Sequence, residues 1–263
     1  MTFSFTSEAP QLMLLKAPLV QAMCQIRFAQ VPELVDDDNE RKLAALLDPN
    51  YPIRGTVQGA QLSVFGGPAN LPVETFRTFE DVDGYWKVTV AQDAVTLETR
   101  AYFDRDDLLE RTSAVLEAVA QVRKPPKVTR VGVRYTDRIL NPQGLRKLVH
   151  PSLLGMLSEV EDDILVDHQS TQVGLNDVST NSQVLVRSLL LPANAKFDPN
   201  ISPVDGPSWI LDIDSSNQES LRFVVDEVIE RARLLAKRAY QVFYWAVTDE
   251  FRTTYGVEAG VES

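Results

Sequence analysis

The alternation of apolar and polar positions is clearest in residues 127–141, KVTRVGVRYTDRILN. The stretch is rich in β-branched residues and ends at an Asn-Pro turn signal, so it predicts a β-strand. Because side chains of a strand point alternately to its two faces, one face would be apolar: Val131, Val133, Tyr135 and Ile139. The opposite face would carry a row of three arginines: Arg130, Arg134 and Arg138. A strand with these two faces is typical of a sheet whose helices pack on one side only.

A similar alternation at Leu19 to Phe28 predicts a first strand, with Arg27 on its polar face. The dipeptide Asp83-Gly84 between two apolar runs is a strong hairpin signal. Further strands are predicted at 61–65, 76–80, 85–90, 95–102, 167–175, 183–191 and 209–214. Most of them follow one another without an intervening helix, which favours an antiparallel sheet.

Helical spacing of apolar residues predicts two long amphipathic helices. The first begins after Asp104 or Asp106 and runs to about Val122, and the second runs from about Gln218 to beyond Val247. A shorter helix is expected at 38–47, and 145–166 is expected to be partly helical. Residues 1–10 resemble a loose leader, and 192–207 form a long proline-containing loop, which is the best candidate for a mobile or functional loop.

The predicted fold class is therefore α+β, with curved antiparallel sheet and two long amphipathic helices packed on one face. Residues 1–263 are expected to form one domain. Two fused α+β halves, about 15–142 and 143–256, are the alternative. Each half has several strands and one long helix, but residue-level self-similarity is too weak to establish a duplication.

Charge and cysteine content narrow the functional classes. The 37 acidic residues exceed the 26 basic ones, for a formal charge of −11. Such a chain repels phosphate backbones, so nucleic acid is not an expected partner unless a local basic patch overrides this repulsion. Cys24 is the only cysteine, so no intrachain disulfide can form, and a buried inert thiol is favoured over a nucleophile. No signal peptide and no apolar stretch of about 18 residues is visible, so the expected location is cytoplasmic, with no membrane partner.

Three segments carry a resemblance to a sporadically distributed bacterial protein family of about 250 residues, which is known mainly by a profile model and has no assigned activity. They are 17–28, 130–139 and 211–214, and the pattern at 243–251 is similar. The chain departs from the family at Val133 and at Thr136-Asp137, where Leu and Ile-Asn are expected. The resemblance spans nearly the whole chain and implies one complete unit. The scattered distribution of the family implies an accessory role such as phage defence, immunity or toxin neutralisation.

The candidate binding residues are the charged groups that alternate onto one strand face: Arg130, Arg134, Arg138, Asp212, Asp214 and Arg27. Glu98, Arg100 and Arg187 are further candidates for the same surface. Arginine has a planar guanidinium that holds a carboxylate or phosphate with two parallel hydrogen bonds. The row therefore predicts either a surface that grips an anionic group of a partner or a cross-strand salt ladder on a solvated sheet face. The sequence leaves both interpretations open.

An alternative site is the pair Asp212-x-Asp214, which resembles the divalent-metal carboxylates of phosphoryl-transfer enzymes. The glycine-serine element that holds phosphate in nucleotidyltransferases is missing. His150 and His168 lack the spacing of a zinc site or a catalytic triad, and no cofactor or bound metal is predicted. Tyr240, Tyr244 and Trp245 extend beyond the apolar stripe of the last helix, so they belong either to the core or to a partner surface.

The sequence thus predicts a non-catalytic binding or accessory protein that holds a protein or peptide partner on a charged sheet face or loop. Immunity, antitoxin-like and chaperone-like roles all fit this description, and a homo-oligomer is also compatible with it. The alternative is a metal-dependent phosphoryl-transfer enzyme that uses Asp212 and Asp214.

Overall fold

A computed structural model describes residues 2–12, 14–59, 74–161 and 164–256. The strand expected at 61–65 lies outside the described residues. The described chain forms a ten-stranded antiparallel sheet in the order β2-β3-β4-β5-β1-β6-β9-β8-β7, with β10 beside β6. The strands are β1 Leu19–Phe28, β2 Ile53–Gly59, β3 Glu74–Glu80, β4 Trp86–Val90, β5 Ala94–Thr99, β6 Lys127–Leu140, β7 Gln169–Asp177, β8 Ser182–Leu191, β9 Ser208–Asn217 and β10 Leu221–Arg222. The mixed class with an antiparallel sheet is confirmed.

Five α-helices occur in the described residues: α1 Asp37–Leu47, α2 Arg105–Arg123, α3 Leu145–Leu148, α4 Val225–Ala246 and α5 Asp249–Tyr255. Short 3-10 turns lie at Pro32–Val35, Pro151–Leu153 and Gly155–Ser158. Within these described ranges, no helix has the length and apolar character that crossing a membrane requires.

The long C-terminal helix begins later than predicted, at Val225 rather than Gln218. Strand β9 continues to Asn217, whose side-chain oxygen accepts a hydrogen bond from the backbone N–H of Glu219 at 2.8 Å and stabilises a turn. Leu221 of β10 then pairs with Val128 of β6, so this residue is in a strand although it lies within the predicted helix. Strand β2 was not predicted, because its sequence IRGTVQG contains two glycines and little alternation.

The chain divides into two compact units that are interleaved along the sequence. Unit 1 comprises Met1–Ala22, Val133–Ser216 and Leu234–Ser263, and unit 2 comprises Met23–Gly132 and Asn217–Arg233. Strands β1 and β6 and helix α4 therefore each contribute residues to both units. These units do not coincide with the sequence halves 15–142 and 143–256.

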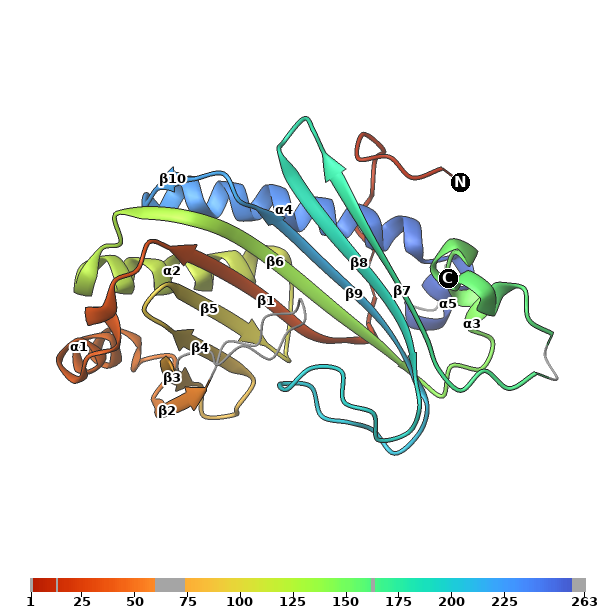
Figure 1. Ribbon diagram of the computed structural model, residues 1–263, viewed down its shortest axis with the longest axis horizontal. Helices are drawn as coiled ribbons and strands as arrows, with labels where there is room; N and C mark the ends of the chain where they lie inside the picture. The colour runs from red at the N-terminus through yellow and green to blue at the C-terminus, as the bar shows by residue number, and fades with distance from the viewer. Residues whose placement is uncertain (1, 13, 60–73, 162–163, 257–263) are drawn as a thin grey trace, which may run out of the picture. The chain divides into compact units, whose positions relative to one another are not determined.

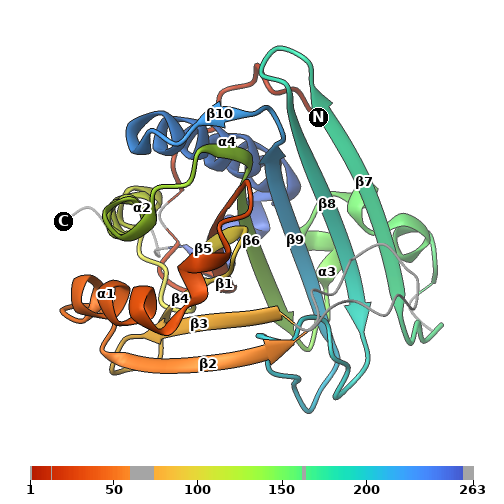
Figure 2. The ribbon, with the colours of Figure 1, turned by 60° about the vertical axis from the view of Figure 1, so that its left-hand side comes forward.

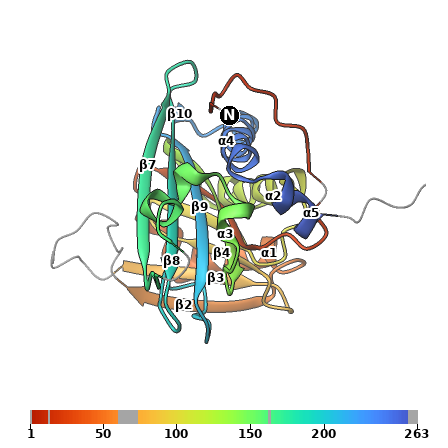
Figure 3. The same ribbon diagram turned by 90° about the vertical axis from the view of Figure 1, so that its right-hand side faces the viewer.

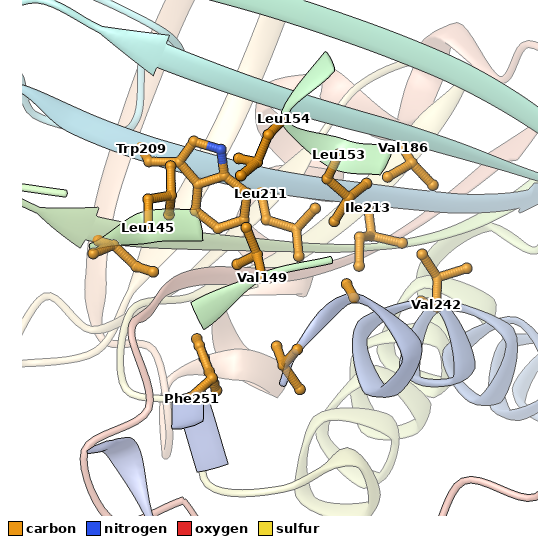
Figure 4. Close-up of a cluster of buried hydrophobic side chains, with 14 of the residues drawn as sticks. Leu145, Val149, Leu153, Leu154, Val186, Trp209, Leu211, Ile213, Val242 and Phe251 are labelled. Carbon is orange, nitrogen blue, oxygen red and sulfur yellow. The ribbon is translucent and has the colours of Figure 1, made fainter. Parts of the chain in front are cut away.

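In unit 1 the core lies between strands β6, β8 and β9 and the C-terminal part of α4 (Figure 4). The largest buried side chain is Trp209, whose indole N–H donates to the Ser188 hydroxyl at 2.9 Å. The other members are aliphatic residues and Phe251: Ile139, Leu145, Val149, Leu153, Leu154, Val184, Val186, Leu211, Ile213, Ala239, Val242, Ala246 and Val247. The alternation predicted for β9 and β8 thus places their apolar sides against α4.

The N-terminal residues of unit 1 are not a loose leader, because hydrogen bonds hold them to α4. The Gln241 side-chain amide donates to the carbonyls of Phe5 and Ser7, both at 2.9 Å. The Tyr240 hydroxyl donates to the Pro10 carbonyl at 2.8 Å and accepts from the Leu12 N–H at 2.7 Å. The ring of Phe3 also packs edge-on against Trp245, with centroids 5.7 Å apart. The extra aromatic residues on this helix are therefore partly covered by the chain's own N-terminal segment.

In unit 2, strands β2 to β5 form an antiparallel meander, with helices α1 and α2 beside each other (Figure 2). The predicted cap of α2 is confirmed: the Asp104 carboxylate accepts a hydrogen bond from the Asp107 N–H at 2.8 Å. Gly84 adopts a positive φ of 67° in the predicted hairpin turn. Cys24 is fully buried, as predicted, and its burial raises the pKa of the thiol to about 12.

Candidate binding site on the arginine face of unit 1

The centre of the site is Asp212, whose side chain is completely buried. One carboxylate oxygen accepts hydrogen bonds from Arg134 Nε at 2.5 Å and from the Thr136 hydroxyl at 2.8 Å. The other oxygen accepts from Arg187 Nε at 2.8 Å and lies 2.7 Å from Arg187 Nη2. Two guanidiniums and one hydroxyl therefore satisfy both oxygens of this carboxylate.

Strand geometry explains this arrangement. The antiparallel register of β8 and β9 places Arg187 directly opposite Asp212, where cross-strand side chains are close enough to interact. Arg134 and Thr136 are two residues apart on β6, so both point to the face that Asp212 occupies. The register of two neighbouring strands cannot be read from their separate patterns, and for this reason Arg187 was only a secondary candidate in the sequence.

The loop of residues 192–207, between β8 and β9, covers this face. Asp198 accepts a hydrogen bond from Arg134 Nη1 at 2.9 Å. The ring of Phe197 lies 5.6 Å from the Arg134 guanidinium and 5.7 Å from that of Arg187, within the range of cation–π attraction. Arg138 Nη1 donates to the Ser202 carbonyl at 2.6 Å. Arg134, Arg138 and Arg187 therefore contact a loop of their own chain, so the face is not solvated at these residues, although the salt-ladder interpretation assumed that it is.

Arg134 and Arg138 differ in their electrostatic surroundings although they are four residues apart on the same strand face. Burial opposes the charged form of Arg134, but the carboxylates of Asp212 and Asp198 outweigh it and raise the pKa of the guanidinium. For Arg138, burial lowers the pKa and no carboxylate opposes it. The Arg138 residue is only 7% exposed, and its Nε atom has no hydrogen-bond partner among the described residues. Arg138 is thus a buried cation without a counter-ion in this part of the chain.

Asp137 is a buried carboxyl group that the sequence analysis did not select. It lies on the opposite face of β6 from Arg134 and is 4% exposed. Burial, with a smaller contribution from the negative charge of Asp212, raises the pKa of Asp137 to about 7. A signal was present in the sequence, because alternation places Asp137 on the apolar face with Val133, Tyr135 and Ile139.

The predicted set of charged residues divides between the two units. Arg134, Arg138, Asp212 and Asp214 belong to unit 1, with Asp214 opposite Leu185 on the same side of β9 as Asp212. Arg27 and Arg130 belong to unit 2, where Arg27 forms an ion pair with Asp93 at 2.6 Å and Arg130 donates to the Gln25 side chain at 3.2 Å. The local contacts of Arg27 and Arg130 therefore differ from those of the Asp212 site.

The geometry gives no support to a metal site at Asp212. A divalent ion needs free carboxylate oxygens, whereas both oxygens of Asp212 accept bonds from arginines. Among the residues that the structure describes, no group of three or more His, Cys, Asp or Glu side chains is placed to hold a metal ion. His150 stacks on Trp245 at 4.3 Å, and His168 is paired with its neighbour Asp167 on the surface.

Comparison with known proteins does not identify a family. No protein-family model matches the chain, and no curated protein matches it in sequence. The resemblance to the sporadically distributed bacterial family therefore stays a prediction, and a functional conclusion depends on the geometry of the site.

Proposed function

We propose that this chain is a non-catalytic binding protein that holds a protein or peptide partner on the arginine face of unit 1. The observation that carries the proposal is the way residues 197–198 occupy that face. Phe197 places an aromatic ring over two guanidiniums, and Asp198 places a carboxylate on one of them. The ligand class that fits is therefore a peptide segment with an aromatic residue next to an acidic one.

The charge balance of the site favours an incoming carboxylate. Arg134 and Arg187 share Asp212, and Arg134 also has Asp198. Within the described part of the chain, Arg138 contacts the neutral Ser202 carbonyl and no carboxylate, so its buried charge lacks compensation there. A partner carboxylate that reached Arg138 would form a charge-assisted hydrogen bond, which is stronger than the bond to a neutral carbonyl.

The loop is suited to exchange with such a partner. Its contacts with β6 are made by a few groups: Asp198 and the Phe197 ring with Arg134, and the Ser202 carbonyl with Arg138. Several of its residues are exposed, including Pro199, Asn200 and Pro203. A partner that presents the same chemistry can replace Phe197 and Asp198 without rearranging the strands below.

Packing of both long helices on one face of the sheet would leave the arginine face for the loop and the partner. An accessory role in immunity, toxin neutralisation or chaperoning follows only from the family resemblance, as does a bacterial origin. A cytoplasmic location follows only from the sequence.

A peptide of residues 194–203, supplied as a separate molecule, tests the proposal. Its binding is measured by fluorescence anisotropy to the double variant Phe197→Ala/Asp198→Ala, in which the internal ligand is removed. We expect the native peptide to bind the variant more tightly than the wild-type protein, and salt to weaken the binding. A peptide with alanine and asparagine in place of its Phe and Asp is the control. Equal binding of the two peptides would refute the proposal.

A separate measurement addresses the enzymatic alternative. Titration calorimetry with magnesium or manganese, with and without nucleotides, is expected to give no binding heat. Saturable heat that disappears in Asp212→Asn would favour the phosphoryl-transfer alternative.

A further inference from the structure

Strand β7 is an edge strand of unit 1 and is paired along its whole length on one side only. All nine of its residues pair with β8, and no second strand pairs with it among the residues that the structure describes. Figures 1 and 3 show β7 on the outside of the layer formed by β9, β8 and β7. The outer backbone N–H and C=O groups of such a strand can pair with another strand.

The sequence of β7, QSTQVGLND, lacks the usual protection of an edge. It contains no proline and no lysine, which commonly block strand addition. Its only charged residue is Asp177, which is buried and forms an ion pair with Arg238 at 2.7 Å. Apart from the buried Asp177, the edge formed by residues 169–176 therefore carries no charge.

Some exposed apolar side chains lie on this strand and in the segments beside it. Val173, at the centre of β7, is 51% exposed although it is apolar. Four more large apolar residues in the flanking segments are exposed: Met156, Ile164, Leu165 and Val178. An apolar side chain at the centre of an unpaired edge strand can be covered when a second strand is added.

We propose that β7 pairs in antiparallel fashion with β7 of a second copy of this chain, with Val173 at the two-fold axis. In that register Thr171 faces Leu175, Ser170 faces Asn176 and Gln172 faces Gly174, so no like charges oppose each other. A two-fold interface requires such a self-complementary surface. The chain as a whole carries a charge of −11, so two copies repel each other at long range. Pairing through β7 adds no close like-charge contact to this repulsion, and it does not involve the arginine face.

The first test measures the mass of the protein in solution by sedimentation velocity. We expect a dimer for the wild-type chain. Val173→Lys places two like charges opposite each other, and it should raise the dissociation constant at least about tenfold, a loss of ~1.4 kcal/mol. The control Val82→Lys makes the same charge change at an exposed residue of unit 2, and it should leave the dimer intact. A monomeric wild-type chain, or equal dissociation constants for the two variants, would overturn the proposal.

A second test reads the register of pairing. The native Cys24 is buried, so a thiol-reactive cross-linker acts on an introduced cysteine only. Val173→Cys should form covalent dimers rapidly with a short bismaleimide, because the two copies of this residue meet at the axis. Ser170→Cys should not, because its two copies are separated by six residues along the strand, or about 20 Å. Cross-linking of Ser170→Cys at the rate of Val173→Cys would overturn the proposed register.

Discussion

The two units of this chain differ in where they place their ion pairs. Unit 1 contains several buried pairs: the side chains of Arg134 and Asp212 are 14% and 0% exposed, and those of Arg238 and Asp177 are 11% and 7% exposed. In unit 2 many pairs lie on the surface, for example Asp38 with Arg41 and Glu33 with Arg123. Exposed pairs contribute little to stability, whereas removing one member of a buried pair leaves an uncompensated charge.

This difference indicates that the charged residues have different roles in the two units. In unit 1 they connect strands β6, β8 and β9 to the loop 192–207, so they determine local structure. In unit 2 the core of Cys24, Ile26, Leu108 and Leu116 is apolar, and surface pairs surround it. Breaking a buried pair of unit 1 should therefore be costly, and breaking an exposed pair of unit 2 should be nearly neutral.

The largest expected effect is that of Asp212→Ala. The substitution leaves Arg187 without its carboxylate and Arg134 with only Asp198, and a broken buried network costs about 3–5 kcal/mol. The free energy of unfolding from denaturant titration measures this loss. Asp38→Ala, which removes an exposed pair in unit 2, should cost less than about 1 kcal/mol. Equal losses of unfolding free energy in the two variants would show that the buried pair of unit 1 stabilises the fold no more than the exposed pair of unit 2.

The next effect concerns Asp137 and depends on pH. Because the folded state raises the pKa of Asp137 from 3.8 to about 7, the folded state binds this proton more tightly than the unfolded state. The contribution of Asp137 to stability is therefore fully present below pH 4 and is lost as the pH rises to 7. At 1.36 kcal/mol for each unit by which the pKa is raised, the total change in the free energy of unfolding is roughly 4 kcal/mol.

The variant Asp137→Asn removes this titration. We expect it to be more stable than the wild-type protein at pH 8 and to lack the stability loss between pH 4 and 7, as measured by denaturant titration at several pH values. Asp205→Asn, an exposed position in the loop, provides the same chemical change without burial. If the free energy of unfolding of Asp137→Asn depends on pH as it does in the wild-type protein, another group is responsible for that dependence.

Strand and helix positions were largely predictable, because they depend on local periodicity. The two-residue alternation located β6 and assigned Val131 and Val133 to its buried face. The helical spacing and the cap at Asp104 located α2. Strand β2 was missed because its partner β3, rather than its own composition, makes it a strand.

The candidate site was predictable only in part. Alternation correctly placed Arg134, Arg138 and Asp212 on one side of their strands, but it predicts no depth of burial. The burial of Arg134 results from residues 197 and 198, which are more than sixty residues away in the chain. A loop whose position depends on tertiary contacts has no periodic pattern, so its contact with the arginines could not be derived from the sequence.

A smaller effect is expected where the N-terminal segment binds α4 in unit 1. Tyr240→Phe removes the hydroxyl that contacts Pro10 and Leu12, and lost hydrogen bonds of this kind cost about 1 kcal/mol each. Trypsin cleavage after Lys16, the first basic residue of the chain, should become faster as the segment detaches more often. Tyr85→Phe, at an exposed tyrosine of unit 2, should not change the cleavage rate. An unchanged rate in Tyr240→Phe would show that the hydroxyl does not hold the segment.

The smallest effect is expected at Arg138, and it tests whether burial alone makes an arginine of unit 1 important. Arg138→Met removes a buried charge that has no carboxylate partner, together with one hydrogen bond to the Ser202 carbonyl. Relief of the burial penalty and loss of that bond act in opposite directions, so the free energy of unfolding should change by less than about 1 kcal/mol. Arg134→Met is the matched comparison, because it deprives both Asp212 and Asp198 of a cation and should cost at least about 3 kcal/mol. If Arg138→Met is as damaging as Arg134→Met, the loop contact of Arg138 is itself structural, and Arg138 is not the uncompensated cation of the site.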